Sequence, residues 1–285
     1  MYYPYFRGKQ YELLAIKELV QRNKIDNKVI PIIEPVNEDV KKLNDFKKIL
    51  NQEAKKFVII KNPQVGDYKG QVSTKLTQKS PMIGEIINSG SSNVNNIDIA
   101  FPITNLSQKR VAKLSQTADI ATSNSQYVPK KDRLILFEDK FHKQSKNEDY
   151  LRNPDEFFSS DNKKYKEINA KGFGDYSIVG SKFQRSGGQA KEVSIHIVYL
   201  DEEDDIRVRH FTSNLGNGTS NLDKKIQTVI RDFCKWYENQ SEDNHSIGAN
   251  EIKKRLDKPV NLAKLKQYSI MHHLEIIDNY LNKNI

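Results

Sequence analysis

Residues 29–60 contain two apolar runs, Val29-Ile-Pro-Ile-Ile33 and Phe57-Val-Ile-Ile60, separated by a charged segment. Within that segment, apolar residues between 40 and 50 recur at the spacing of one helix face. Short runs that are apolar throughout are typical of parallel strands whose two faces are both covered. We therefore predict a strand, a helix and a second strand that belong to one parallel sheet.

The same alternation extends in both directions from this unit. Residues 10–21 have the spacing of an amphipathic helix. Strands are expected near residues 2, 29, 57, 97, 118, 133 and 175, mostly alternating with helices. A short helix is predicted over 81–88 and an interrupted one over 147–169. This order predicts an α/β fold of the (β/α)8-barrel-like kind.

The C-terminal part departs from that alternation. Val193–Leu200 and Ile206–Thr212 predict an antiparallel strand pair, joined by the acidic turn Asp201-Glu-Glu-Asp-Asp205. Helices are expected from Leu222 to Glu238 and from Leu262 to Asn282.

Two domains are expected from these elements. Residues 1–240 would form the α/β barrel-like domain, and residues 241–285 a C-terminal helical extension packed on the barrel. The 285 residues are enough for either one large domain or two smaller ones.

The composition excludes several classes of protein. With 36% hydrophobic and 29% charged residues, the chain is polar for a globular protein but too periodic for disorder. The formal net charge of +9 is compatible with nucleic acid or a nucleotide as partner. The single cysteine, Cys234, excludes an internal disulfide and a cysteine-based zinc site, and we expect it in a core. No run approaches the ~20 apolar residues that cross a bilayer. We expect a soluble, cytoplasmic protein with no membrane partner.

Polar residues follow the predicted strands, and ligands of barrels bind beyond the carboxyl ends of strands. The candidate catalytic residues are Glu34, Lys61, Asp139 and Asp175. Arg7 and Lys9 are candidate ligand-binding residues of the N-terminal segment. Such a mixture suits a phosphate-bearing ligand, with or without a divalent ion such as Mg²⁺ on Glu34, Asp139 and Asp175. The alternative is a ring of internal salt bridges that closes the barrel mouth.

Two glycine-rich loops flank the strand pair, and their candidate ligand-binding residues are Lys182, Arg185, Gly187 and Gly188 in the first and Gly216 and Gly218 in the second. The second loop opens into the helix at Leu222, where the N-terminus favours an anion and Ser220 or Asn221 is expected as cap. Neither loop matches the P-loop or the dinucleotide fingerprint. We therefore expect phosphate binding, with a mobile loop at a hairpin end as the alternative.

The histidines give weaker signals. His196 alternates within a predicted strand, so we expect a satisfied core residue. His272 and His273 are adjacent on a predicted helix and so diverge by about 100°. We expect them at the surface and at the edge of that helix.

Three sequence blocks carry a resemblance to a family: Tyr3-Pro-Tyr-Phe-Arg-Gly-Lys-Gln-Tyr-Glu-Leu-Leu-Ala15, Ile30-Pro-Ile-Ile-Glu-Pro35 and Gly174-Asp-Tyr176. In this order, over most of the chain, they resemble the "beta protein" family of bacteria and phages. The resemblance implies a barrel-like α/β fold, a mobile-element or phage-defence setting and a small nuclease-like partner. It implies no activity and no catalytic residue.

Three functions remain open from the sequence. The first is a module that binds a phosphate-bearing ligand or nucleic acid and acts with a nuclease-like partner in anti-phage defence. The second is a metal-dependent phosphodiesterase or nuclease that uses Glu34, Asp139 and Asp175. The third is a structural interaction protein that makes contact through its aromatic N-terminal edge and its C-terminal helix.

Overall fold

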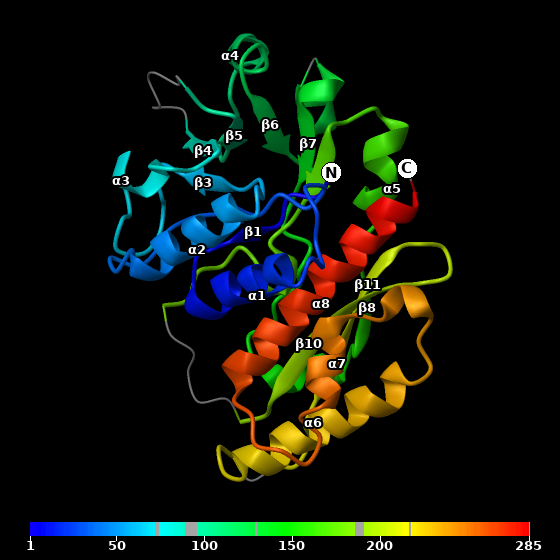
Figure 1. Cartoon of the computed structure of the whole chain (residues 1–285). Coiled ribbons are helices and arrows are strands. Elements are labelled where there is room, and N and C mark those ends of the chain that lie inside the picture. Colours follow the sequence, from blue (N-terminus) through cyan, green and yellow to red (C-terminus); the bar gives the residue numbers. More distant parts are fainter. Residues whose placement is uncertain (72–73, 89–95, 129, 186–190, 217, 285) are drawn as a thin grey trace. The chain divides into compact units, whose positions relative to one another are not determined.

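The computed structural model describes residues 1–71, 74–88, 96–128, 130–185, 191–216 and 218–284 (Figure 1). Contacts divide the chain into two compact units. Unit 1 comprises Met1–Asp139 and Asp161–Tyr176, and unit 2 comprises Lys140–Ser160 and Ser177–Ile285. The domain boundary expected at residue 240 stays a prediction.

Unit 1 is built on an 8-stranded parallel sheet with the strand order β1-β2-β3-β4-β5-β6-β7-β9. Its strands are β1 (Tyr5–Phe6), β2 (Ile32–Ile33), β3 (Val58–Ile60), β4 (Met82–Ile87), β5 (Ile99–Pro102), β6 (Asp119–Thr122), β7 (Leu134–Phe137) and β9 (Gly172–Gly174).

The two edges of this sheet meet at the N-terminus. Tyr2 forms parallel bridges both to Val29 and to Phe173. The backbone N–H of Tyr3 donates to the carbonyl of Phe173, and that of Tyr5 to the carbonyl of Asp175, both at 2.8 Å. The sheet is thereby nearly closed, which confirms the expected barrel-like fold.

One strand of the barrel was not expected. The short helix predicted over 81–88 is wrong, because Met82–Ile87 is β4, which pairs with β3 and β5. A Cβ atom on Gly84 would lie 2.7 Å from Cδ1 of Ile60, so the glycine lets β3 and β4 pack closely. Pairing on both sides thus overrides the weak local signal of this segment.

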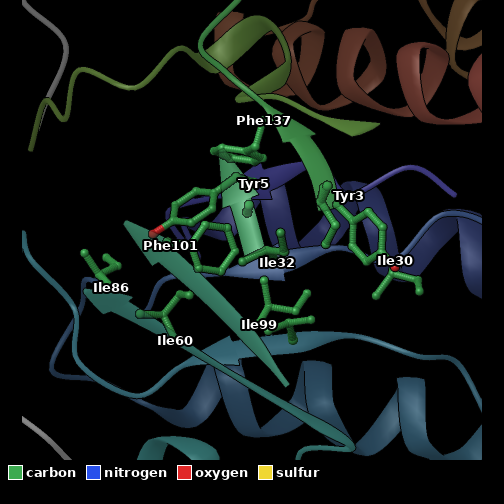
Figure 2. Packing of buried hydrophobic residues seen from close by; sticks show 12 residues of the cluster. Tyr3, Tyr5, Ile30, Ile32, Ile60, Ile86, Ile99, Phe101 and Phe137 are labelled. Atoms are coloured by element: carbon green, nitrogen blue, oxygen red, sulfur yellow. The ribbon is translucent and has the colours of Figure 1, made fainter. Parts of the chain in front are cut away.

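Side chains fill the barrel, as Figure 2 shows. The cluster includes Tyr3, Tyr5, Ile30, Ile32, Ile60, Ile86, Ile99, Phe101 and Phe137. The ring of Tyr5 meets that of Phe101 edge-on at 5.7 Å between centroids, and Phe101 meets Phe137 at 5.5 Å. The interior is therefore a packed core and not a pore.

The helices of unit 1 are α1 (Gln10–Gln21), α2 (Lys41–Gln52), α3 (Thr74–Thr77), α4 (Gln108–Leu114) and α5 (Asp161–Glu167), with 3₁₀ turns η1 (Ser125–Tyr127) and η2 (Lys131–Arg133). α1 has the predicted bounds. Glu12 in its first turn accepts hydrogen bonds from the backbone N–H of Arg7 at 3.0 Å and of Lys9 at 3.1 Å. These hydrogen bonds from the first turn of α1 to the preceding residues fix the path of the chain between β1 and α1.

Unit 2 contains a 3-stranded antiparallel sheet with the order β10-β11-β8. Its elements are η3 (Asn147–Leu151), β8 (Asp155–Ser159), η4 (Ser177–Val179), β10 (Ser194–Leu200), β11 (Ile206–Thr212), α6 (Leu222–Tyr237), η5 (Glu242–Asn244), α7 (Ile247–Lys253) and α8 (Leu262–Lys283). The predicted strand pair is confirmed, and Cys234 is buried as expected. The helix expected over 147–169 is wrong at β8, where pairing with β11 and the aromatic pair Phe157-Phe158 favour a strand.

The surface position expected for His272 and His273 is also wrong. α8 is buried on most of its circumference, and both histidines are 0% exposed. His272 lies between the carbonyl of Val198 at 2.6 Å and the hydroxyl of Ser246 at 2.8 Å. Nδ1 of His273 lies 2.8 Å from the hydroxyl of Ser177. Because adjacent residues of a helix diverge by about 100°, the two rings contact different partners, and these partners all belong to unit 2.

The two asparagine N-caps of unit 2 differ, and a pair of substitutions tests the difference. The side chain of Asn261 accepts from the N–H of Lys264 at 2.8 Å, whereas Asn221, at φ 58°, makes no side-chain cap bond to α6. Asn261→Ala should lower the free energy of unfolding by about 1 kcal/mol. Asn221→Gly should change it by less than about 0.5 kcal/mol, because glycine adopts the left-handed conformation without strain. Urea denaturation measures both, and an equal loss in the two variants would contradict this assignment.

Candidate functional site

Arg7 and Glu34 form an ion pair at the carboxyl ends of β1 and β2. Arg7 is 9% exposed and Glu34 is 0% exposed. The guanidinium carbon lies 5.3 Å from the ring centroid of Tyr5 and 5.6 Å from that of Tyr176. The two rings also pack on each other, with 4.9 Å between centroids, so the guanidinium lies against an aromatic pair at the mouth of the barrel.

Glu34 is fixed by donors from three directions. Its Oε2 accepts from the hydroxyl of Tyr5 at 2.7 Å, and its Oε1 from the backbone N–H of Gln64 at 2.6 Å. Burial raises the pKa of Tyr5 well above its ordinary value, so this hydroxyl stays a donor. A carboxylate held in this way orients the guanidinium of Arg7.

Asp139 belongs to the same region as Arg7. Burial raises the pKa of Tyr176, the charge of Asp139 raises it further, and the charge of Arg7 lowers it. Tyr176 also packs on Phe137 of β7, with 5.2 Å between ring centroids. Of the four expected catalytic residues, Glu34 and Asp139 therefore share the surroundings of Arg7 and Tyr176.

Lys61 points away from this group. Ile60 and Ile86 belong to the interior cluster, and side chains alternate along a strand, so Lys61 and Glu85 face the outside of the barrel. There they form an ion pair of 2.9 Å.

Asp175 also lies outside the barrel. It is 1% exposed, and its Oδ1 accepts from the hydroxyl of Tyr2 at 2.9 Å. The ring of Tyr2 stacks on Phe173, at 5.0 Å between centroids. The carboxylates that would hold Mg²⁺ do not gather, and no group of three or more His, Cys, Asp or Glu side chains suited to a metal occurs in the described part of the chain.

The remaining candidate residues fall in two places. Lys9 is the N-cap of α1 in unit 1, while Lys182 and Arg185 are exposed in unit 2. Gly187 and Gly188 lie outside the described residues.

The second glycine loop holds a carboxylate of its own chain. The backbone N–H of Gly216 donates to Oε1 of Glu192 at 2.9 Å, and the hydroxyl of Ser213 donates to Oε2. Lys225 donates to the carbonyl of Gly218 at 2.6 Å and lies 3.6 Å from Glu192. The loop therefore binds a carboxylate of its own chain, and phosphate binding by Gly216 and Gly218 stays a prediction.

One group of side chains was missed by the interpretation of the sequence. His196 was expected to be a satisfied core residue, but it lines a cavity of about 210 Å³ in unit 2. Its Nδ1 lies 2.8 Å from Nδ1 of His210, whose Nε2 lies 3.3 Å from Oε1 of Glu156. The signal that could have found this pair is the register of the hairpin, since the acidic turn places His196 opposite His210.

The two surfaces named for a structural interaction protein are largely buried, and that function stays a prediction. Tyr2, Tyr3, Tyr5 and Phe6 of the N-terminal segment are at most 2% exposed. α8 has most of its side chains buried in unit 2.

Comparison with known proteins yields no match among family models, curated proteins or solved structures. None of the described helices is long and apolar enough to cross a membrane. The geometry of the two units is thus the ground for a functional interpretation.

Proposed function

We propose that the barrel of unit 1 binds a phosphate-bearing ligand, either a nucleotide or a nucleic acid, through Arg7. The observation that carries this proposal is the guanidinium at the end of β1, which is oriented by Glu34 and lies against the packed rings of Tyr5 and Tyr176. A guanidinium has five N–H donors in a planar fork whose geometry matches phosphate oxygens. The ring of Tyr176, which is only partly buried, suits the ring of a base or a nucleoside.

Binding is a better interpretation than metal-dependent hydrolysis. Two-metal or single-metal phosphodiester chemistry needs carboxylates that converge on one ion. Glu34 is instead engaged by Arg7 and Tyr5, and Asp175 by Tyr2 on the outer face of the barrel. The net charge of +9 supports a polyanionic ligand.

The biological setting of the proposal comes from the resemblance to the "beta protein" family. We propose that the protein is the ligand-binding component of an anti-phage defence system and acts with a nuclease-like partner. In unit 2, Lys182 and Arg185 are both exposed and form a separate set of candidates for contacts to the phosphates of a nucleic acid.

The substitution Arg7→Lys tests the role of the guanidinium. Lysine keeps the positive charge beside Glu34 but has no planar fork, so affinity for a labelled single-stranded oligonucleotide should fall about tenfold, which is ~1.4 kcal/mol. Arg22→Lys is the matched control, because Arg22 also pairs with a glutamate of unit 1 but is largely exposed. Fluorescence anisotropy measures the affinity, with pyrophosphate as competitor and thermal melting as a check on folding.

A further variant separates the two sets of candidate residues. Lys182→Ala with Arg185→Ala should weaken oligonucleotide binding and reduce the slope of log affinity against log salt by about 0.7 per lost phosphate contact. It should leave the competition by pyrophosphate unchanged. Unchanged affinity in a well-folded Arg7→Lys variant would overturn the barrel mouth as the ligand site.

A further inference from the structure

The cavity of unit 2 has both apolar and cationic walls. Its lining includes the side chains of Phe141, Tyr150, Ile178 and Val179 on one hand, and Lys143 and Lys266 on the other. A volume of about 210 Å³ exceeds what a single water occupies, and an apolar cavity of ~150 Å³ accommodates benzene. The walls and the volume suit a small organic anion.

His196 lines this cavity, and only one of its two ring nitrogens forms a hydrogen bond to a described residue. Nδ1 is hydrogen-bonded to His210, whereas Nε2 forms no hydrogen bond with any residue that the structure describes. The ring packs against Phe141 and Tyr150, with centroids 4.9 Å and 4.7 Å away. Nε2 is therefore the polar atom that an occupant of the cavity would meet.

The hydrogen bonds fix which nitrogen carries each proton. The carboxylate of Glu156 can only accept, so Nε2 of His210 donates to it. Nδ1 of neutral His210 is then an acceptor and receives the proton of Nδ1 of His196. Nε2 of His196 is consequently a bare lone pair, and a proton added there can be shared along the chain towards Glu156.

The charges around this chain come from several elements. His196 on β10 faces His210 on β11, Glu156 on β8 and Tyr150 on η3, with Lys143 and Lys266 on the cavity wall. His142 and Asp155 act on His210 from further out. Burial, His210 and both lysines hold the pKa of His196 well below its ordinary value. His196 is thus neutral at pH 7 in these surroundings.

We propose that this cavity binds a small organic carboxylate of about the size of benzoate, and that binding adds one proton to the chain His196–His210–Glu156. The carboxylate brings a negative charge next to His196, which favours the protonated ring, and Lys143 and Lys266 attract the anion. The apolar walls contact the organic body. The site lies wholly in unit 2 and is independent of the barrel mouth of unit 1.

Isothermal titration calorimetry with benzoate as the probe tests this proposal on the full chain. Titrations at pH 7 in two buffers with different heats of ionisation measure the protons taken up. We expect one site per chain, uptake of about one proton, and an affinity that rises about tenfold per pH unit from pH 8 to pH 6.

Two variants and one control make the assignment specific. His196→Asn should weaken binding at least tenfold and abolish proton uptake. Lys266→Met should weaken binding but leave uptake intact, and it serves as the test if His196→Asn does not fold. His142→Asn is the control, because His142 contacts the same Glu156 at 3.4 Å but is largely exposed and does not line the cavity. It should change affinity by less than twofold.

Any of the following results would overturn the proposal. They are no binding of benzoate, binding without proton uptake, and an equal loss of affinity in His142→Asn and His196→Asn. Binding of inorganic phosphate in place of benzoate would refute the carboxylate as ligand class.

Discussion

Replacing Gly174 by alanine should prevent the barrel of unit 1 from closing. A Cβ atom at this position would lie 2.4 Å from the carbonyl oxygen of Tyr3 and 2.9 Å from Cδ2 of Phe137. That oxygen belongs to the N-terminal segment before β1, which the backbone hydrogen bonds from Tyr3 to Phe173 and from Tyr5 to Asp175 hold against β9. We expect a loss of unfolding free energy of about 3 kcal/mol or more, the upper range for overpacked sites.

Gly70→Ala is the matched control for this substitution. Nothing lies within 4 Å of a Cβ atom built on Gly70, whose φ is +74°. Gly70→Ala should lower the free energy of unfolding by about 1 kcal/mol, which is the strain of an alanine in the left-handed conformation. Urea denaturation followed by circular dichroism compares the two variants. If Gly174→Ala lost no more stability than Gly70→Ala, closure of the sheet at β9 would not require a glycine.

The requirement at Gly174 illustrates why the barrel was predictable only in part. Fully apolar runs such as 29–33 and 57–60 indicate parallel strands without any knowledge of their partners. β4 carries a mixed sequence, and its strand conformation depends on β3 and β5 at either side. β8 depends in the same way on β11, which lies far from it in the sequence. Local patterns thus predicted the strands whose own sequence is apolar throughout. They missed β4 and β8, whose strand conformation depends on pairing with other strands.

The same distinction applies to the candidate site. The rule that ligands bind at carboxyl strand ends led to Glu34 and Asp139, which lie with Arg7 at the barrel mouth. It also led to Lys61, which the alternation of side chains assigns to the outer face once Ile60 is known to point inward. Position along a strand was therefore predictable, but the face that a residue occupies required the core to be known.

The pairing of His196 with His210 was within reach of the sequence. The hairpin aligns Leu200 with Ile206, so residues equally distant from the turn lie opposite one another. The link from His210 to Glu156 was not within reach, because it needs the unexpected strand β8.

Unit 2 should lose stability steeply as the pH falls below about 6.5. Burial lowers the pKa of His272 to about 4 and that of His273 to about 3, and it lowers those of His196 and His210 as well. In an unfolded chain these residues titrate near pH 6.5. The unfolded state therefore binds more protons than the folded state between about pH 6.5 and pH 4, and stability rises with pH in that window. Above it, the contribution is complete and constant.

The size of the effect follows from the number of residues involved. Each histidine that stays neutral in the folded state lowers the free energy of unfolding by about 1.4 kcal/mol for every pH unit of acidification in this window. His272 and His273 alone should remove about 5 kcal/mol between pH 6.5 and pH 4.5, which is comparable with the whole stability of many domains. Trp236, the single tryptophan, lies in α6 of unit 2 and packs on Phe211, so its fluorescence reports the unfolding of this unit.

Urea denaturation at a series of pH values, followed by Trp236 fluorescence, measures this dependence. His273→Asn should be less stable at pH 7, because the bond to Ser177 is disturbed, but its stability should fall less steeply between pH 6.5 and pH 4.5. The slope is compared and not the starting value, so the test separates titration from packing. Ser177→Ala is the control, because it removes the hydroxyl that contacts Nδ1 of His273 but keeps the histidine, so it should lower stability at pH 7 and leave the slope unchanged. A flat dependence from pH 7 to pH 5 in the unmodified protein would show that the buried histidines do not govern its acid stability.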